Sequence, residues 1–97
     1  MEIKELNKEQ KLNILNEILG FCPKGNCFLC VTIPRIALSM CYITKTEYYS
    51  YFSTDIAKSL IPELSQFEPS HVRYSWFKTT AERVEAVRKM IKIIKEK

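Results

Sequence analysis

The stretch Tyr74-Ser75-Trp76-Phe77-Lys78-Thr79-Thr80-Ala81-Glu82-Arg83 decides the fold, because here an aromatic and basic segment leads into the best-formed helix of the chain. Thr79 and Glu82 have the spacing of a capping box, in which each side chain accepts a hydrogen bond from the other residue's backbone amide. Apolar residues then recur at helical spacing, at Val84, Val87, Ile91 and Ile94. The sequence therefore predicts an amphipathic C-terminal helix with one buried stripe.

Arg83 lies in the first turn of this predicted helix, beside Val87 and Ile94 at the edge of the apolar stripe. A helix dipole disfavours a cation in the first turn, so we expect the guanidinium to have an anionic partner. One partner is a carboxylate of this chain, such as Glu63 or Glu68, reached by snorkelling past the core. The other is a bound anion held with the amides of the helix N-terminus.

Length and charge favour a single small domain, residues 1–97, that gains stability by associating with a second copy. Residues 1–70 carry 7 Lys and Arg against 8 Asp and Glu, whereas residues 71–97 carry 8 against 3. This local surplus favours an anionic partner but is too small to require a nucleic acid. No apolar run reaches the roughly 18 residues of a membrane span, and no signal peptide is recognisable, so we expect a soluble, cytoplasmic protein.

Three further helices are expected before the C-terminal one. Asn7 caps a helix from Lys8 to Leu19, with Gln10 at the third position, and Gly20 ends it. The apolar segment 27–41 is interpreted as a helix that is kinked or restarted at Pro34. Its start, Cys27–Ile33, would also suit a strand, but no second strand is evident to pair with it.

Thr44 and Glu47 form another capping box, with Ile43 and Tyr48 as a hydrophobic staple. The helix that follows is predicted to run to about Leu60. Its inward face is expected to consist of Tyr48 or Tyr49, Phe52, Ile56 and Leu60. From Ile61 to Lys78 no periodicity appears, which predicts a long irregular loop with a binding role.

The cysteines and the single histidine give little support for a metal site or an enzyme. Cys22, Cys27 and Cys30 have a C-x4-C-x2-C spacing, and Cys41 is a fourth thiol. Their apolar surroundings suit small buried residues better than an iron–sulfur cluster, zinc or a disulfide. His71 has no recognisable catalytic partner, and no phosphate-binding or hydrolase motif is present. We therefore expect a non-enzymatic protein without a metal or cofactor.

A group of aromatic and basic residues gives stronger evidence for a binding site than the cysteines and the histidine do. Tyr74, Trp76 and Phe77 alternate with Arg73 and Lys78, and three more tyrosines follow Thr44 at Tyr48, Tyr49 and Tyr51. Aromatic faces hold a base by stacking, while guanidinium groups or a helix N-terminus hold its phosphates. Alternatively, Trp76 and Phe77 cover one end of the core, and the tyrosines line a surface or dimer contact.

The order of these features resembles that of small all-helical proteins encoded by phages and prophages. The features are an N-terminal helix, the segment Gly25-Asn26-Cys27-Phe28-Leu29, the pair Glu47-Tyr48, the aromatic segment 74–77 and Arg83 before a basic terminal helix. Pro34 departs from this pattern. The resemblance implies a non-enzymatic accessory protein, and some small phage proteins act as oligomeric sponges that sequester nucleotide signals of host defence.

The sequence thus predicts an all-α fold, a compact bundle of about four helices with a long irregular aromatic loop before the last one. The leading hypothesis is a homo-oligomer that sequesters a compact anionic, nucleotide-like ligand as an anti-defence factor. Its expected ligand-binding residues are Arg83, Trp76, Tyr74, Arg73, Lys78, His71, Thr79, Tyr48 and Tyr51. The second hypothesis is an inhibitor or adaptor that binds a host protein through the same aromatic surface. The third is nucleic-acid binding through Arg88, Lys89, Lys92 and Lys95.

Overall fold

Helices make up the regular structure of the described part of the chain. The computed structural model describes residues 3–21, 29–67 and 80–97. The elements, in chain order, are α1 (Lys8–Phe21), α2 (Leu29–Ser39), α3 (Lys45–Ser50), α4 (Ser53–Leu60), the 3-10 helix η2 (Pro62–Phe67) and α5 (Thr80–Lys95). No strand occurs in these ranges, and the predicted all-α fold class is confirmed.

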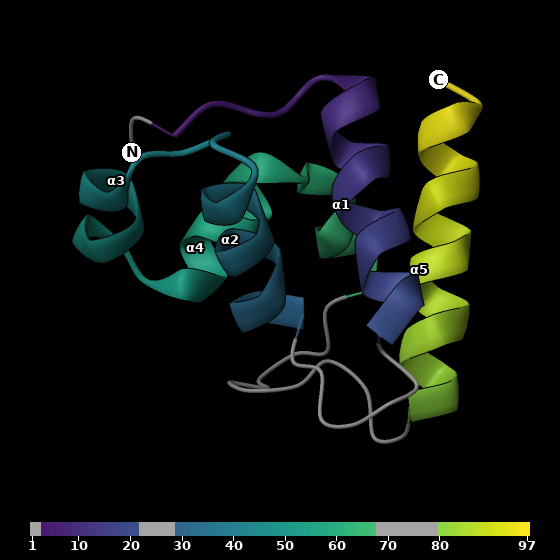
Figure 1. Ribbon diagram of the computed structural model, residues 1–97. Helices are drawn as coiled ribbons and strands as arrows, with labels where there is room; N and C mark the ends of the chain where they lie inside the picture. Colours follow the sequence, from purple (N-terminus) through teal and green to yellow (C-terminus); the bar gives the residue numbers. More distant parts are fainter. Residues whose placement is uncertain (1–2, 22–28, 68–79) are drawn as a thin grey trace.

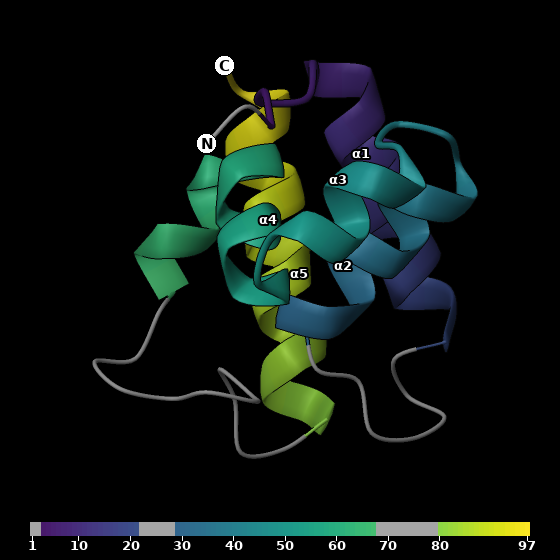
Figure 2. The same ribbon diagram turned by 90° about the vertical axis from the view of Figure 1, so that its left-hand side faces the viewer.

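The helices are arranged in two layers. α1 and α5 lie side by side and run in opposite directions (Figure 1). α2 and α4 pack against each other in front of this pair, and α3 stands at the outer corner beside α2 (Figure 2). The Lys8 ammonium links α1 to the end of α5, because it donates to the backbone carbonyls of Lys95 at 3.0 Å and Lys97 at 3.1 Å. A cation at a helix C-terminus is also favoured by the helix dipole.

One hydrophobic core joins the two layers. Its fully buried side chains come from every described helix except α3, and they include Ile14, Leu15, Ile18, Leu29, Ile33, Ile56, Leu60, Leu64, Val87, Met90 and Ile94. On α5 the buried residues recur at the predicted helical spacing, whereas the basic side chains at 88, 89, 92 and 95 are exposed. Each buried aliphatic side chain stabilises the fold by about 1.5–3 kcal/mol relative to exposure.

Two predicted helix starts are confirmed at atomic detail. The Asn7 side chain accepts from the Gln10 amide at 2.8 Å, and the Gln10 side chain accepts from the Asn7 amide at 3.1 Å. Thr44 and Glu47 form the same reciprocal pair at the start of α3. These contacts involve residues three apart, so the local sequence is enough to specify them.

The predicted end of the first helix is wrong by a short distance. α1 continues through Gly20 to Phe21, and Gly20 does not have a positive φ. It therefore does not form the left-handed cap that glycine often provides. The backbone of a glycine is compatible with a helix, and here the packed face of α1 outweighs its weak helix propensity.

Residues 29–33 are helical, which settles the choice between helix and strand for this part of 27–41. Leu29, Ile33 and Ala37 recur at a spacing of four and are all buried. α2 continues across Pro34 without a restart, although proline cannot donate to the carbonyl four residues earlier. The proline ring is buried, so packing helps to retain it inside the helix.

The end of α2 has a hydrogen-bond pattern that the sequence did not reveal. The Tyr42 amide donates to the Ala37 carbonyl at 2.8 Å, and the Cys41 amide donates to the Leu38 carbonyl at 3.1 Å. Cys41 has a φ of 63°, in the left-handed region. Together these features form a Schellman motif with cysteine at the position that glycine usually occupies.

The predicted helix from Thr44 to Leu60 is wrong, because it is two helices. α3 ends at Ser50 and α4 begins at Ser53, with Tyr51 and Phe52 extended between them. The break changes the helical phase, so that Phe52 is exposed instead of facing inward, while Ile56 and Leu60 are buried as expected.

The irregular segment predicted for residues 61–78 is wrong for its first part. Residues 62–67 form the 3-10 helix η2, which packs against α4 and α5. Pro62 suits the first position of such a turn, since its missing amide would have no partner there. Ile61 and Leu64, three residues apart, are both buried beneath it. The remainder of the predicted loop lies outside the described residues.

Among the described residues, no helix combines the length and the apolar character that crossing a membrane requires.

Candidate aromatic binding site

The junction between α3 and α4 forms an exposed aromatic corner, consisting of Tyr48, Tyr49, Tyr51 and Phe52. Tyr51 (φ −129°, ψ 159°) and Phe52 (φ −68°, ψ 140°) have extended backbones. The Phe52 carbonyl accepts the first α4 hydrogen bond, from the Ile56 amide at 3.0 Å. Phe52 is thus the N-cap residue, but its side chain has no acceptor with which to cap the helix. The ring is free to extend away from the helix end.

Two aromatic side chains of the corner face solvent. Tyr49 is 78% exposed and Phe52 is 82% exposed, and within the described ranges they are the exposed large hydrophobic residues. Tyr48 and Tyr51 are partly buried against the core. The corner therefore presents an outer pair of rings on an inner pair that is anchored to the fold.

The orientation of Tyr49 is supported by its neighbour. The rings of Tyr48 and Tyr49 meet edge to face, with centroids 5.1 Å apart and an interplanar angle of 85°. This geometry places the positive edge of one ring against the negative face of the other. Because Tyr48 also packs on the core, Tyr49 is partly ordered in the unbound protein. It therefore loses less conformational entropy when a ligand binds.

A pocket of about 300 Å³ opens at the corner, lined by Tyr49, Ser50, Tyr51, Phe52 and Asp55. Its lining contains one carboxylate and no basic side chain. Asp55 lies in the first turn of α4, where an anion is favoured by the helix dipole, and it is exposed. In the part of the chain that the structure describes, Asp55 forms no ion pair. Three aromatic rings and a carboxylate, with no basic side chain in the lining, make this pocket suited to a cation.

A second pocket of about 330 Å³ lies where the N-terminal segment crosses α1 and α3. It is lined by Ile3, Lys4, Glu5, Leu6, Gln10, Tyr42, Ile43 and Glu47. Several of its polar groups already have partners: Gln10 and Glu47 serve helix caps, and Glu5 binds Lys11. The aromatic corner is the better candidate for a ligand, because two large rings are exposed beside its pocket.

Of the nine predicted ligand-binding residues, Tyr48 and Tyr51 lie at the aromatic corner. His71, Arg73, Tyr74, Trp76, Lys78 and Thr79 lie outside the described residues, as does the side chain of Arg83. α5 begins at Thr80, directly after the predicted cap, although the capping contact itself is not described. The nucleotide-like site therefore stays a prediction.

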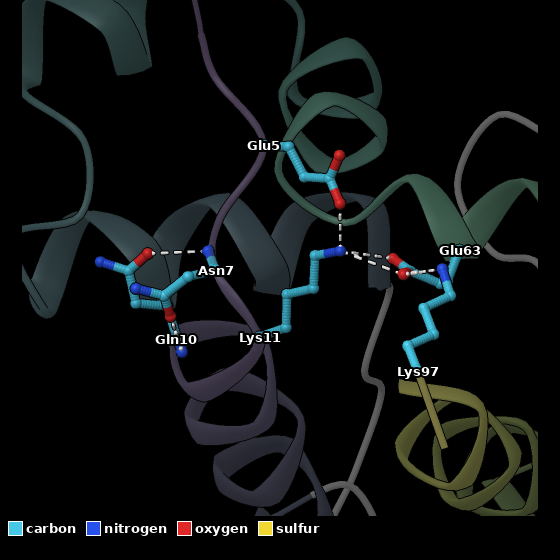
Figure 3. Close-up of polar contacts among 6 residues, drawn as sticks. All are labelled: Glu5, Asn7, Gln10, Lys11, Glu63 and Lys97. Carbon is cyan, nitrogen blue, oxygen red and sulfur yellow. Dashed lines mark hydrogen bonds and ion pairs between the residues drawn. The ribbon is translucent and has the colours of Figure 1, made fainter. Parts of the chain in front are cut away.

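Glu63, one of the two carboxylates suggested as a partner for Arg83, has other partners among the described residues, and the side chain of Arg83 lies outside them. Glu63 binds the ammonium groups of Lys11 and Lys97. Lys97 follows the end of α5, about four helical turns or about 20 Å along the axis from Arg83. The Glu63 carboxylate is held beside Lys97, just beyond the C-terminal end of α5 (Figure 3).

A charge cluster that the sequence patterns did not reveal consists of the buried pair Lys11 and Glu63 and the exposed side chains of Glu5 and Lys97, and is called the buried charge cluster. The Lys11 ammonium donates to both oxygens of Glu63, at 2.9 and 3.0 Å, and to the Glu5 carboxylate. Lys97 donates to the same Glu63 carboxylate, so that four segments meet here (Figure 3). Lys11 and Glu63 are only 4% and 3% exposed.

Hydrogen bonds and ion pairs within the cluster outweigh the effect of burial on the pKa values of Lys11 and Glu63. Burial disfavours the Lys11 ammonium, but hydrogen bonds to Glu5 and Glu63 raise the pKa of Lys11 above its ordinary 10.5. Burial likewise disfavours the Glu63 carboxylate, but hydrogen bonds from Lys97 and Lys11 lower the pKa of Glu63 below its ordinary 4.5. Both groups are therefore charged at neutral pH, and the cluster links elements rather than offering a reactive group.

The sequence contains signals for the charge cluster and for the break between α3 and α4, neither of which was predicted. Lys11 shares a helical face with Ile14, Leu15 and Ile18, at the i, i+3, i+4 and i+7 positions, which marks it as inward-facing. The polar run 53–55, Ser-Thr-Asp, is typical of a helix start and marks the break before α4.

The cysteine alternatives are tested only at Cys41, which is an exposed free thiol. Cys22 and Cys27 lie outside the described residues, as does the side chain of Cys30. Within the described part, no group of three His, Cys, Asp or Glu side chains is placed to hold a metal.

Comparison with known proteins finds no family model, no curated protein and no solved structure that matches this chain.

Proposed function

We propose that this chain is a small non-enzymatic binding protein that docks a protein partner on its aromatic corner. The observation that carries the proposal is the exposure of Tyr49 and Phe52 on a short, well-anchored turn. Aromatic residues are enriched among the few interface residues that contribute most of the binding energy.

The corner has the construction expected of an interface anchor. Isolated exposed hydrophobic residues are common, but here two large rings flank one pocket and are continuous with partly buried rings beneath them. A partner that covers Tyr49 and Phe52 removes apolar surface from water, worth about 25 cal/mol per Å² before the costs of association. Because the backbone on either side is helical, little ordering of the corner is required on binding.

Sequestration of an anionic ligand, the leading hypothesis from sequence, stays a prediction, because most of its expected site residues lie outside the described part of the chain. The pocket at the corner carries Asp55 and no basic side chain in its lining. The phage-type and anti-defence role, like the homo-oligomer, stays a prediction.

Peptide display against the immobilised protein tests the proposal. We expect selected peptides to bind the wild type and to lose at least about tenfold in affinity on the double variant Tyr49→Ser/Phe52→Ser, which is roughly 1.4 kcal/mol. Arg88→Ala, an exposed change on α5, serves as the control and should leave affinity unchanged.

Failure to select any peptide, or selection of peptides that bind the double variant equally well, would overturn the proposal. Analytical ultracentrifugation of the wild type and of the double variant tests whether the corner binds a second copy of this chain. Self-association that disappears in the double variant would show that the corner binds a second copy of this chain instead.

A further inference from the structure

We propose that the pocket of the aromatic corner receives an arginine side chain of the partner, held against the rings of Tyr49, Tyr51 and Phe52 and paired with Asp55. This inference rests on the proposed function and names the chemistry that the site recognises. It assigns a cation to this pocket, whereas the sequence predicted an anion at a different site, around Trp76 and Arg83.

The lining of the pocket sets the sign of the ligand. Tyrosine and phenylalanine rings present faces of negative potential, to which cations are attracted. Asp55 adds a formal negative charge, and the pocket lining contains no lysine or arginine to neutralise it. A nucleotide phosphate would meet repulsion from both sources.

The N-terminus of α4 opposes this preference for a cation, because its free backbone amides favour an anion. Asp55 already occupies that role, since it lies in the first turn of the helix. Lys58 follows one turn later on the same helix, is half-buried, and is not part of the pocket lining. The carboxylate of Asp55 thus lies at the start of α4 and lines a pocket bordered by aromatic rings.

Size and shape favour a single planar cationic side chain. A volume of about 300 Å³ is at the lower limit of pockets that hold small molecules, and a nucleotide is large for it. Guanidinium is planar and weakly hydrated, stacks on aromatic faces and pairs with a carboxylate through two parallel hydrogen bonds. An ammonium group offers only the point charge, so arginine suits this pocket better than lysine does.

The edge-to-face contact with Tyr48 adds a structural reason for the assignment. It holds the Tyr49 ring in a defined orientation before any ligand arrives. A guanidinium plane stacks on the face of an aromatic ring, and a ring already supported by a neighbour loses less freedom when the ligand binds.

NMR titration of the ¹⁵N-labelled protein with N-acetyl-L-arginine amide tests the inference directly. We expect saturable shift changes at the backbone amides of residues 49–55. N-acetyl-L-citrulline amide has the same shape without the charge, and we expect it to bind at least about fivefold more weakly. Adenosine monophosphate, as the anionic probe, should leave these amides unshifted.

Asp55→Asn removes the charge while keeping the shape, and should weaken binding of the arginine amide about fivefold. Glu85→Gln is the matched control, because it also neutralises one exposed helical carboxylate but lies on α5. Equal binding of the arginine and citrulline amides, or an unchanged affinity in Asp55→Asn, would overturn the inference. A shift of these amides by adenosine monophosphate instead would also overturn it.

The two proposals fail separately. Peptides that depend on Tyr49 and Phe52 but carry no common arginine would overturn the arginine assignment and leave protein docking intact. Charge-dependent binding of the arginine amide without any selected peptide would support the arginine site and overturn protein docking.

Discussion

The buried charge cluster and the aromatic corner reverse the usual distribution of polar and apolar groups. Lys11 and Glu63 are almost fully buried, whereas Tyr49 and Phe52 are more than three-quarters exposed. The charged pair is tolerated inside because each group has hydrogen-bonding partners of opposite charge. The exposed rings of Tyr49 and Phe52 have no such compensation, because their apolar surface stays in contact with water.

The difference indicates what each region does. The cluster connects the N-terminal segment, α1, η2 and the end of α5, which is a structural task. At the aromatic corner, by contrast, α3 has no buried residue, and the outer rings of Tyr49 and Phe52 lie outside the core. Changes to the cluster should therefore affect folding, and changes to the corner should affect binding.

The largest expected effect comes from Glu63→Ala. It leaves the Lys11 ammonium buried with Glu5 as its remaining carboxylate partner, and removing one partner of a buried ion pair costs about 3–5 kcal/mol. We expect a loss of this size in the free energy of unfolding, measured by chemical denaturation. Glu85→Ala on the exposed face of α5 is the control, with an expected change within about 0.5 kcal/mol.

Replacing both buried charges sharpens the same test. Lys11→Met combined with Glu63→Leu removes the need for compensation, and such exchanges are often neutral or stabilising. The double variant should be more stable than Glu63→Ala. If both variants lose the same stability, the cost arises from packing and not from an unpaired charge.

Acidification should weaken the cluster without any mutation. Because the pKa of Glu63 is lowered on folding, the unfolded chain takes up the proton first as the pH falls. The contribution of Glu63 is fully present above its ordinary pKa of 4.5 and is lost as the pH falls through the lower folded value. The stability difference between wild type and Glu63→Gln should therefore shrink over this range in denaturation at a series of pH values. A difference that is independent of pH would contradict this account.

Cys41→Gly should stabilise the fold by a smaller amount. A non-glycine residue in the left-handed region costs about 1–2 kcal/mol, and the greater freedom of glycine in the unfolded chain offsets part of the gain. We expect a net increase of about 0.5–1 kcal/mol in the free energy of unfolding. Cys41→Ala also removes the thiol but keeps the strain, so it should show no such gain. Equal stabilisation by both variants would assign the effect to the thiol.

The smallest effect on stability is expected at the corner. Tyr49→Ser should change the free energy of unfolding by within about 0.5 kcal/mol, because its side chain is exposed. Phe52→Ser should not lower the free energy of unfolding, because this ring is also exposed and serine at the N-cap of α4 can accept a hydrogen bond that phenylalanine cannot. Ile56→Ala, four residues beyond Phe52 and fully buried, should cost about 2–5 kcal/mol in the same denaturation measurement. A large loss in Phe52→Ser would show that this ring is structural and would weaken the proposed binding role.

Local sequence predicted the features that depend on neighbours along the chain. The capping boxes at Asn7 and Thr44 involve residues three apart, and the apolar stripe of α5 repeats within one helix. The break between α3 and α4 was missed because Tyr51 and Phe52 fit a continuous helical pattern as well as a turn. Of the candidate site, the sequence identified the tyrosine-rich segment but neither the pocket nor the role of Asp55.

By itself, the sequence determined that this chain is all-α, where α1 and α3 begin and which face of α5 is buried, since these follow from hydrogen bonds and periodicity over a few residues. Only the tertiary structure decided that Lys11 meets Glu63 and that Phe52 faces solvent while Ile56 faces the core. The physical reason is that these outcomes depend on segments distant in sequence. A charge is stable in the interior only where another segment brings its partner, and a ring is exposed only where the path of the backbone leaves the core.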